Sequence, residues 1–247
     1  MISVDTIYQR VLATANKEQR GYITPQEFNL FANQAQMDIF DQYFYDVDKF
    51  SRVHGNETET GDMLDLLNEK IDIFEVKNVG VMGGINLPSP PAFPEIYILG
   101  NIMFGTAAAN RVEVERVSEK ELMIAMQSPL VQPRNERPMY VRQGIVGTGN
   151  QIIVWGHNTG TGVPTQITAN ITCNYIRRPV NGNWNFVVVN GYAQYNAASS
   201  TNFELHPSEE NNLVHKILEL AGIVMKDANL YQIASQEEIK DIQQEKS

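Results

Sequence analysis

The hydrophobic period of this chain changes twice, and that change limits the possible folds more than any other feature of the sequence. Apolar residues follow a helical spacing in residues 1–45 and again in residues 207–222. Between about residue 70 and residue 200 they alternate with a period nearer two. We therefore expect an α+β protein, in which an N-terminal helical hairpin and a C-terminal helix form a helical bundle and a β-rich, barrel or sandwich-like domain is inserted.

The predicted domain boundaries follow these changes of pattern. The bundle takes residues 1–68 and 203–234, and the β-rich domain takes residues 69–202. After Ile223 the helical pattern is weak, because only Ile239 and Ile242 give the last segment an apolar edge. We expect residues 235–247 to be a C-terminal arm that becomes ordered on a partner.

Start and stop signals mark the helices. Thr24, Pro25 and Glu27 occupy the N-cap, the first helical position and the return arm of a capping box. A short polar turn joins this helix to the one before it, so the two are expected to pack as an antiparallel pair. The C-terminal helix is expected to begin near Pro207 and to stop at Gly222.

Alternating segments mark the strands, which are predicted at residues 95–104, 112–115, 139–142, 151–155 and 166–175. The dipeptide Asn181-Gly182 signals a hairpin turn, and residues 184–192 continue the β pattern beyond it. Ser118 and Glu121 open a short helix inside this region. The proline-rich residues 88–94 predict an extended, rigid connector.

Composition excludes several classes of protein. The chain is 43% apolar and 19% charged, which is typical of a globular protein. Its single cysteine, Cys173, excludes an intrachain disulfide, a Cys-rich zinc site and an iron–sulfur cluster. The net charge is −10 and the only tight basic pair is Arg177–Arg178, which argues against a nucleic-acid scaffold. No stretch is apolar enough for a signal peptide or membrane span, so we expect a soluble, unprocessed protein.

No motif predicts catalysis, a cofactor or a metal. Residues 16–28 imitate a calcium-binding loop, but Arg20 stands where an oxygen ligand is needed. The four histidines form no catalytic or metal-binding spacing. Cys173 lies on the apolar face of a predicted strand, which favours core packing over a reactive thiolate. We therefore expect a structural or interaction protein, not an enzyme.

Three stretches resemble virion structural proteins of tailed bacteriophages, of the neck-ring or head-to-tail adaptor type found in crAss-like and marine podovirus-type phages. These stretches are residues 16–29, residues 175–179, and residues 203–210 leading into 213–222. The likeness runs in order from about residue 1 to residue 235. It implies a helical bundle with an inserted β domain and no enzymatic activity.

The resemblance also implies partners and a location. Twelve copies would form a ring docked beneath the portal protein, in contact with adjacent neck or tail proteins, in a virion assembled in the cytoplasm of the bacterial host. An acidic channel lets DNA pass without specific binding, since a cationic one would bind phosphate. The chain's 23 Asn and 16 Gln suit contacts between copies, because neutral hydrogen bonds avoid the cost of burying charge. No membrane contact is expected.

Two regions are predicted to contact partners. They are the C-terminal tail with Tyr231, Ile239 and Ile242, and the proline-rich segment with Pro88, Pro90, Pro91 and Pro94. For Arg177 and Arg178, contact with an acidic surface and a solvated strand end remain equal alternatives. A glycan- or receptor-binding β module is an alternative function, in which Trp155, Trp184 and Tyr192 would stack on sugars. A hydrolase is a third alternative that no constellation of residues supports.

Overall fold

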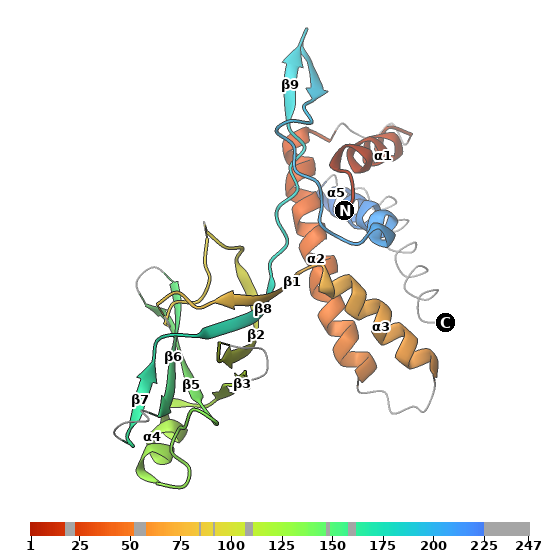
Figure 1. Ribbon diagram of the computed structural model, residues 1–247. Coiled ribbons are helices and arrows are strands. Elements are labelled where there is room, and N and C mark those ends of the chain that lie inside the picture. The colour runs from red at the N-terminus through yellow and green to blue at the C-terminus, as the bar shows by residue number, and fades with distance from the viewer. Residues whose placement is uncertain are drawn as a thin grey trace. The chain divides into compact units, whose positions relative to one another are not determined.

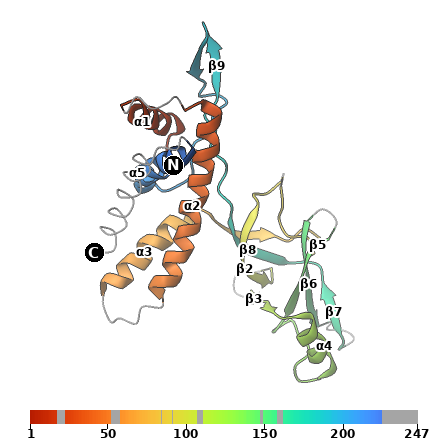
Figure 2. The same cartoon turned by 180° about the vertical axis from the view of Figure 1, so that it is seen from behind.

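The computed structural model describes residues 1–17, 23–51, 58–83, 85–90, 92–106, 111–146, 149–157 and 162–224. Over these residues the protein is mixed α+β and divides into two compact units, shown from opposite sides in Figures 1 and 2. Unit 1 consists of Met1–Ile73 and the chain from Pro179 onward, and unit 2 is the continuous stretch Phe74–Arg178. The division differs from the predicted one, because residues 179–202 belong with the helices and not with the β-rich unit.

Unit 1 contains helices and one two-stranded sheet. Its elements are α1 (Val4–Lys17), α2 (Pro25–Ser51), α3 (Thr58–Asp72), β9 (Phe186–Val189), β10 (Tyr192–Tyr195), the 3-10 helix η2 (Pro207–Glu209) and α5 (Glu210–Val224). Helix α2 packs against α3 and α5, and α5 also packs against α1. Residues on the apolar stripes of these helices are fully buried, among them Ile7, Phe28, Phe40, Leu213 and Ile217.

The predicted capping box at the start of α2 is confirmed. The Glu27 backbone N–H donates to Thr24 Oγ1 at 3.3 Å, and the Thr24 N–H donates to Glu27 Oε2 at 3.0 Å. Hydrogen bonds from the Thr24 hydroxyl and N–H lower the pKa of the Glu27 carboxyl. Two backbone donors that the first turn leaves unpaired are thereby satisfied locally, so the helix start is encoded within four residues.

The predicted antiparallel pairing of the first two helices is wrong. Helix α1 packs on α5, and it meets α2 through Tyr8, whose ring centroid lies 4.8 Å from that of Phe28. The C-terminal helix thus occupies the position that the second helix was expected to take. Gly222 lies inside α5 and does not end it, because Glu210–Val224 is continuous helix.

The two sequence segments of unit 1 are joined by backbone pairing. Ile2 and Phe203 exchange N–H to C=O hydrogen bonds of 2.9 and 3.0 Å, and Phe203 is fully buried. A Cβ added at Gly182 would lie 2.3 Å from the Phe203 ring, so this ring explains the glycine. The predicted hairpin turn at Asn181-Gly182 is therefore wrong, since Gly182 serves close packing and the next residue, Asn183, pairs with Thr201.

Unit 2 contains two four-stranded sheets, counted over its described residues. The first has the order β1-β8-β2-β3 and the second the order β4-β5-β6-β7. The strands are β1 (Glu75–Gly80), β2 (Ile96–Phe104), β3 (Val112–Glu113), β4 (Glu115–Arg116), β5 (Met139–Val146), β6 (Gly149–His157), β7 (Pro164–Ile167) and β8 (Ile171–Arg177). All neighbouring strands are antiparallel except β4 and β5, which are parallel.

Side chains from both sheets share one core in unit 2. Ile102, Cys173 and Tyr175 from the first sheet lie in the same cluster as Ile152 and Val154 from the second. The helix α4 (Glu119–Gln127) packs on the second sheet through a separate cluster of Leu122, Ala125 and Met139. The predicted Ser118/Glu121 capping box is present at its start.

Two predicted strands are each divided between the sheets. Residues 166–175 form β7 and β8, because Asn170 adopts a left-handed φ of 60° and turns the chain between them. Residues 112–115 likewise divide into β3, which pairs with β2, and β4, which pairs with β5. In both segments the apolar alternation continues through the residue at which the chain leaves one sheet for the other. The sequence pattern therefore does not reveal the division.

Candidate interaction surface

The hairpin formed by β9 and β10 exposes most of its apolar side chains. Val187, Val188 and Val189 are 51%, 62% and 41% exposed, and Tyr192 is 77% exposed. The turn residues Asn190-Gly191 have φ angles of 53° and 83°. Two positive φ angles in a two-residue loop are typical of a type I′ turn, whose twist matches that of the paired strands. The hairpin extends beyond the helices of unit 1 in both ribbon views (Figures 1 and 2).

Aromatic rings fix the base of the hairpin to unit 1. Trp184 is buried, and its ring centroid lies 4.2 Å from that of Tyr8 in α1. The same indole stacks on Phe186 of β9 at 5.8 Å and on Tyr195 of β10 at 5.9 Å. Its Nε1–H donates a 2.9 Å hydrogen bond to Oδ1 of Asp5. Both strands are thus held at the point where they leave the helices.

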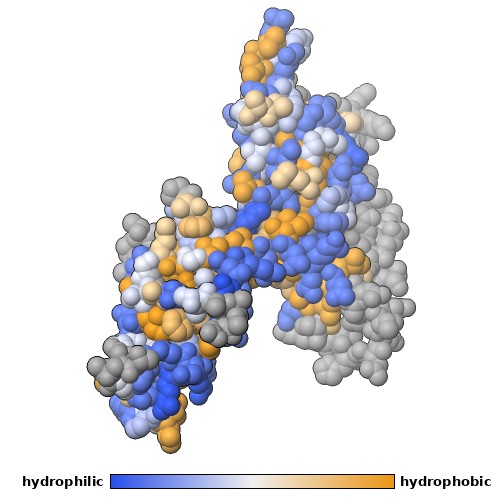
Figure 3. All heavy atoms as spheres, in the orientation of Figure 1, coloured by the Kyte–Doolittle hydropathy of each residue, from blue (hydrophilic) through white to orange (hydrophobic). Residues whose placement is uncertain are grey.

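A second exposed apolar region lies at one end of unit 2. Met123 and Ile124 on α4 are 60% and 61% exposed, and Leu130 in the following loop is 90% exposed. Together with Val131 they form what we call the α4 end. Apolar residues are visible on the β9–β10 hairpin and in the region of the α4 end in Figure 3. Exposed apolar residues gathered in this way are typical of surfaces that bind other proteins.

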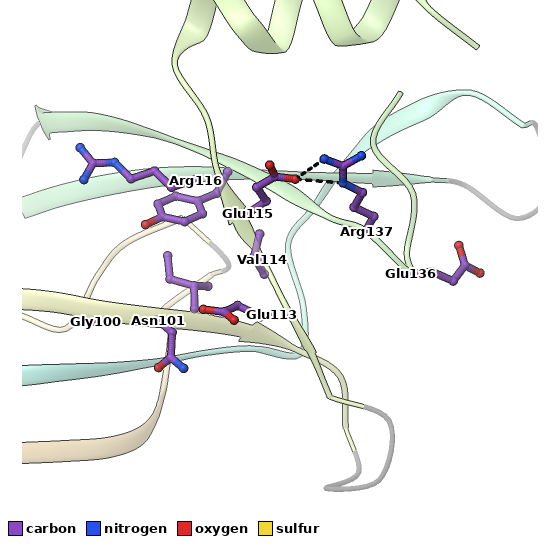
Figure 4. A pocket seen from close by; sticks show the side chains of 10 residues that line it. Gly100, Asn101, Glu113, Val114, Glu115, Arg116, Glu136 and Arg137 are labelled. Carbon is purple, nitrogen blue, oxygen red and sulfur yellow. Dashed lines mark hydrogen bonds and ion pairs between the residues drawn. The ribbon is translucent and has the colours of Figure 1, made fainter. Parts of the chain in front are cut away.

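A pocket in unit 2 is lined mainly by polar side chains and has a volume of about 510 Å³. Within it Arg137 Nη2 and Nε lie 2.8 and 2.9 Å from Glu115 Oε2, and the two side chains point toward one another (Figure 4). Arg116 and Glu136 extend to opposite sides of this pair (Figure 4). Burial raises the pKa of Tyr140, against the opposing effect of Arg116 and Arg142. The lining thus contains one paired arginine and glutamate beside further charged side chains.

A smaller, more apolar cavity of about 320 Å³ lies in unit 1 between α2 and α3. Phe50, Met63 and Leu66 line it. At its edge Lys70 Nζ lies 2.6 Å from Oε1 of Glu209, and the Glu209 side chain is almost fully buried. This ion pair ties η2 to α3, and its Lys70 lines the cavity.

The proline-rich segment is only partly available to partners. Pro88 is buried, whereas Pro90 and Pro94 are exposed. The segment follows Leu87, whose N–H donates to the Asn150 carbonyl at 3.0 Å, so it starts anchored on strand β6 inside unit 2. Pro88 is thus packed inside unit 2, whereas the partner contact expected at Pro90 and Pro94 stays a prediction. Four other predicted contact residues, Pro91, Tyr231, Ile239 and Ile242, lie outside the described residues.

Arg177 and Arg178 have local roles at the end of β8. The Arg177 guanidinium lies 5.7 Å from the centroid of the Phe74 ring, and the Arg177 N–H donates to the Phe74 carbonyl. Arg178 forms a 3.6 Å ion pair with Glu95, and its N–H donates to the Glu95 carbonyl. The two arginines thus bind the last residues of unit 2 to its first strands.

A reactive thiol and a sugar-stacking ring both need exposure to solvent, and most of the residues considered for these roles are buried or half-buried. Cys173 is buried in the core of unit 2, and burial raises the pKa of its thiol to about 11. Trp184 is buried among rings and Trp155 is half-buried, which leaves only Tyr192 of the three predicted stacking residues fully at the surface. Among the described residues, no group of three or more His, Cys, Asp or Glu side chains is arranged to hold a metal ion.

The β9–β10 hairpin has a clear signal in the sequence. Asn190-Gly191 stands between Val187–Val189 and Tyr192, which is the strongest short-range pattern for a type I′ hairpin. The α4 end had no comparable signal, because Met123 and Ile124 carry the same helical apolar pattern as the buried Leu122.

Comparison with known proteins does not assign this chain to a family. No family model matches it, and no curated protein matches it. Within the described ranges, no helix is both long enough and apolar enough to cross a membrane.

Proposed function

We propose that this protein is a structural component of a tailed-phage virion, which forms a ring in the head-to-tail connector. The resemblance of residues 16–29, 175–179 and 203–222 to neck-ring and adaptor proteins supports this proposal. In this proposal the helices of unit 1 act as the bundle of the adaptor and unit 2 acts as its inserted barrel or sandwich-like domain. In this proposal each copy supplies one wedge-shaped subunit of the ring and catalyses no reaction.

The observation that carries the proposal is the pair of exposed apolar surfaces. The β9–β10 hairpin and the α4 end each present apolar side chains on well-formed secondary structure, and neither is covered within its own unit. Leaving such surfaces in water is unfavourable by about 25 cal/mol per Å² of apolar area, so they favour association. A subunit of a ring that is stacked between other rings needs surfaces of this kind for its neighbours.

The net charge of the chain is compatible with a ring through which DNA passes. Its net charge of −10 gives phosphate little to bind, and DNA is proposed to pass through the ring without specific contacts. Twelve copies are proposed, with the portal protein on one side and a neck or tail protein on the other. The C-terminal tail with Tyr231, Ile239 and Ile242 is proposed to dock on one of these neighbours.

Sedimentation of the purified full chain with portal rings from the same genome tests the proposal. We expect the protein to co-sediment with the portal as a defined ring. A chain that stays monomeric and does not bind the portal contradicts the connector position.

Truncation after Val224, the last residue of α5, tests the role of the tail. The truncated chain should keep its circular dichroism spectrum and melting temperature, because it retains every helix and strand described here. We expect it to lose portal binding. Retained binding at full strength would show that the tail is not the docking element.

A further inference from the structure

We propose that the β9–β10 hairpin is the contact between neighbouring copies of this chain, and that the copies pair hairpin edge to hairpin edge. This inference rests on the proposed ring and identifies the segment that closes it. In this arrangement β9 of one copy lies beside β10 of the next, so that successive hairpins build one antiparallel sheet.

Both hairpin edges are open next to the turn, whereas farther along β9 the Phe186 N–H already donates to Asn185 Oδ1 at 2.8 Å. Strand β9 pairs with β10 from Phe186 to Val189, and the sheet they form has no third strand among the described residues. In a two-residue hairpin the pair Val189–Tyr192 next to the turn exchanges hydrogen bonds. The next pair, Val188 and Ala193, therefore directs its N–H and C=O groups outward. These outward N–H and C=O groups can form backbone hydrogen bonds with an added strand.

The hairpin also lacks the features that usually protect an open edge strand from pairing. Natural proteins block open strands with Lys, with other charges, with Pro or with a bulge. Residues 179–203 contain no Asp, Glu, Lys or Arg, and the register of β9 with β10 has no bulge. An exposed, regular and uncharged edge is what a protein avoids unless another strand covers it.

The charge of the chain favours a second copy as the occupant of this edge. Each chain carries a net charge of −10, so copies repel one another wherever charged surfaces face each other. The uncharged hairpin is a place where identical chains can meet without that repulsion. A partner of opposite charge would be recognised by charged side chains, which this segment does not have.

The geometry also suits a closed ring. When two hairpins stand side by side in the same orientation, β10 of one copy runs antiparallel to β9 of the next. This contact is head-to-tail, and a head-to-tail contact closes into a ring when its rotation permits. Anchoring by Trp184 and the type I′ turn keep the hairpin in one conformation, so little entropy is lost on pairing.

Sedimentation of three full-length proteins tests the contact. They are the unaltered chain, Val188→Glu on the hairpin, and Leu30→Glu on α2 as the matched control. Val188 is 62% exposed and Leu30 is 71% exposed, so neither change should disturb folding, which circular dichroism checks. We expect the unaltered chain and Leu30→Glu to form the same oligomer, and Val188→Glu to lose it.

Each other outcome overturns the inference in a different way. If Val188→Glu assembles as well as Leu30→Glu does, the hairpin is not the contact, while the proposed ring stands. If the unaltered chain stays monomeric both alone and with portal rings, both the hairpin contact and the proposed ring fail.

Crosslinking tests whether β9 of one copy lies beside β10 of the next copy. Chains with Val188→Cys and chains with Ala193→Cys are oxidised to disulfides, separately and as an equal mixture. A disulfide needs Cα atoms about 4.4–6.8 Å apart, so it joins adjacent strands but not strands two apart, at about 10 Å. Buried Cys173 is the only native thiol. We expect several-fold more crosslinked dimer in the mixture than in either protein alone. Equal yields in all three samples, or dimer in the Val188→Cys sample alone, would overturn the head-to-tail pairing.

Discussion

Strands β8 and β9 have similar side chains and opposite surroundings. Both carry β-branched and aromatic residues at a strand spacing. In β8, Ile171, Cys173 and Tyr175 are buried, whereas in β9 the three consecutive valines are all exposed. The difference is in the neighbours. Strand β8 lies between β1 and β2 and faces a second sheet, while among the described strands β9 has only β10 beside it.

This comparison shows that apolar composition alone does not place a strand in a core. A strand is buried when other strands cover its edges and another layer covers its face. An apolar strand without covered edges and a covered face is either unstable or binds a partner that covers it. Since the β9–β10 hairpin has a type I′ turn and an aromatic anchor, we favour the second explanation.

Replacing a tyrosine by alanine in β8 and in β10 should give the largest difference in the free energy of unfolding. Tyr175→Ala in β8 removes a fully buried ring, and we expect it to lower the free energy of unfolding of unit 2 by about 3–5 kcal/mol. Tyr192→Ala in β10 removes a ring that is 77% exposed, and we expect a change within about 0.5 kcal/mol. Urea unfolding of the isolated chain measures both. Comparable losses would mean that the hairpin is packed against the protein and does not stand free.

Thiol reactivity should separate the two strands next. At pH 8 a thiol with a pKa of about 11 has a thiolate fraction on the order of a hundredfold lower than an ordinary cysteine, and burial of Cys173 slows its reaction further. A cysteine placed at exposed position 188 should therefore react with a maleimide or a disulfide reagent much faster than Cys173. Rapid labelling of Cys173 in the folded chain would contradict its burial.

The raised pKa of Cys173 also has a consequence for stability. The folded state favours the neutral thiol, so the raised pKa adds to the free energy of unfolding. This stabilisation is complete below the unfolded pKa of about 9 and is lost as the pH rises toward about 11. Replacing Cys173 by Ser, whose hydroxyl does not titrate in this range, should remove this part of the pH dependence. The test is unfolding at a series of pH values from 8 to 11 with both chains.

Local signals explain which parts of the fold could be predicted. The starts of α2 and α4 were predicted correctly, because a capping box acts within four residues and Thr24–Glu27 and Ser118–Glu121 contain all of it. The strand β2 was also predicted within a residue of its start. Each of these features depends on side chains that are adjacent in the sequence.

Contacts between distant residues explain what could not be predicted. Gly182 is required by the ring of Phe203, which is remote in sequence, so the dipeptide Asn181-Gly182 imitates a turn. Asn170 lies in the turn between β7 and β8, which belong to different sheets, although the alternation on either side of it continues in phase. Whether an apolar strand such as β9 is covered depends on the tertiary arrangement, which no local pattern contains.

A matched glycine replacement tests how strongly the type I′ turn fixes the hairpin. Gly191 has a φ of 83°, a conformation that costs about 1–2 kcal/mol for a residue with a Cβ. Gly80 in β1, next to β8, has no positive φ and no atom within 4 Å of an added Cβ. We expect Gly191→Ala to destabilise unit 1 by about that amount and Gly80→Ala to be neutral or slightly stabilising. Equal effects would show that the turn does not constrain the hairpin.

The smallest effect is expected at the hydroxyl of Tyr175. This oxygen is buried and has no hydrogen-bond partner among the described residues, and burial raises its pKa. Because an unsatisfied buried hydroxyl is unfavourable, Tyr175→Phe should be neutral or stabilise unit 2 by up to about 1 kcal/mol. The control is Ser118→Ala, which removes a satisfied hydroxyl and should cost about 1 kcal/mol through loss of the α4 cap. Thermal unfolding of both variants measures the contrast, and a loss at Tyr175→Phe as large as that at Ser118→Ala would show that a bound water or another group satisfies the tyrosine in solution.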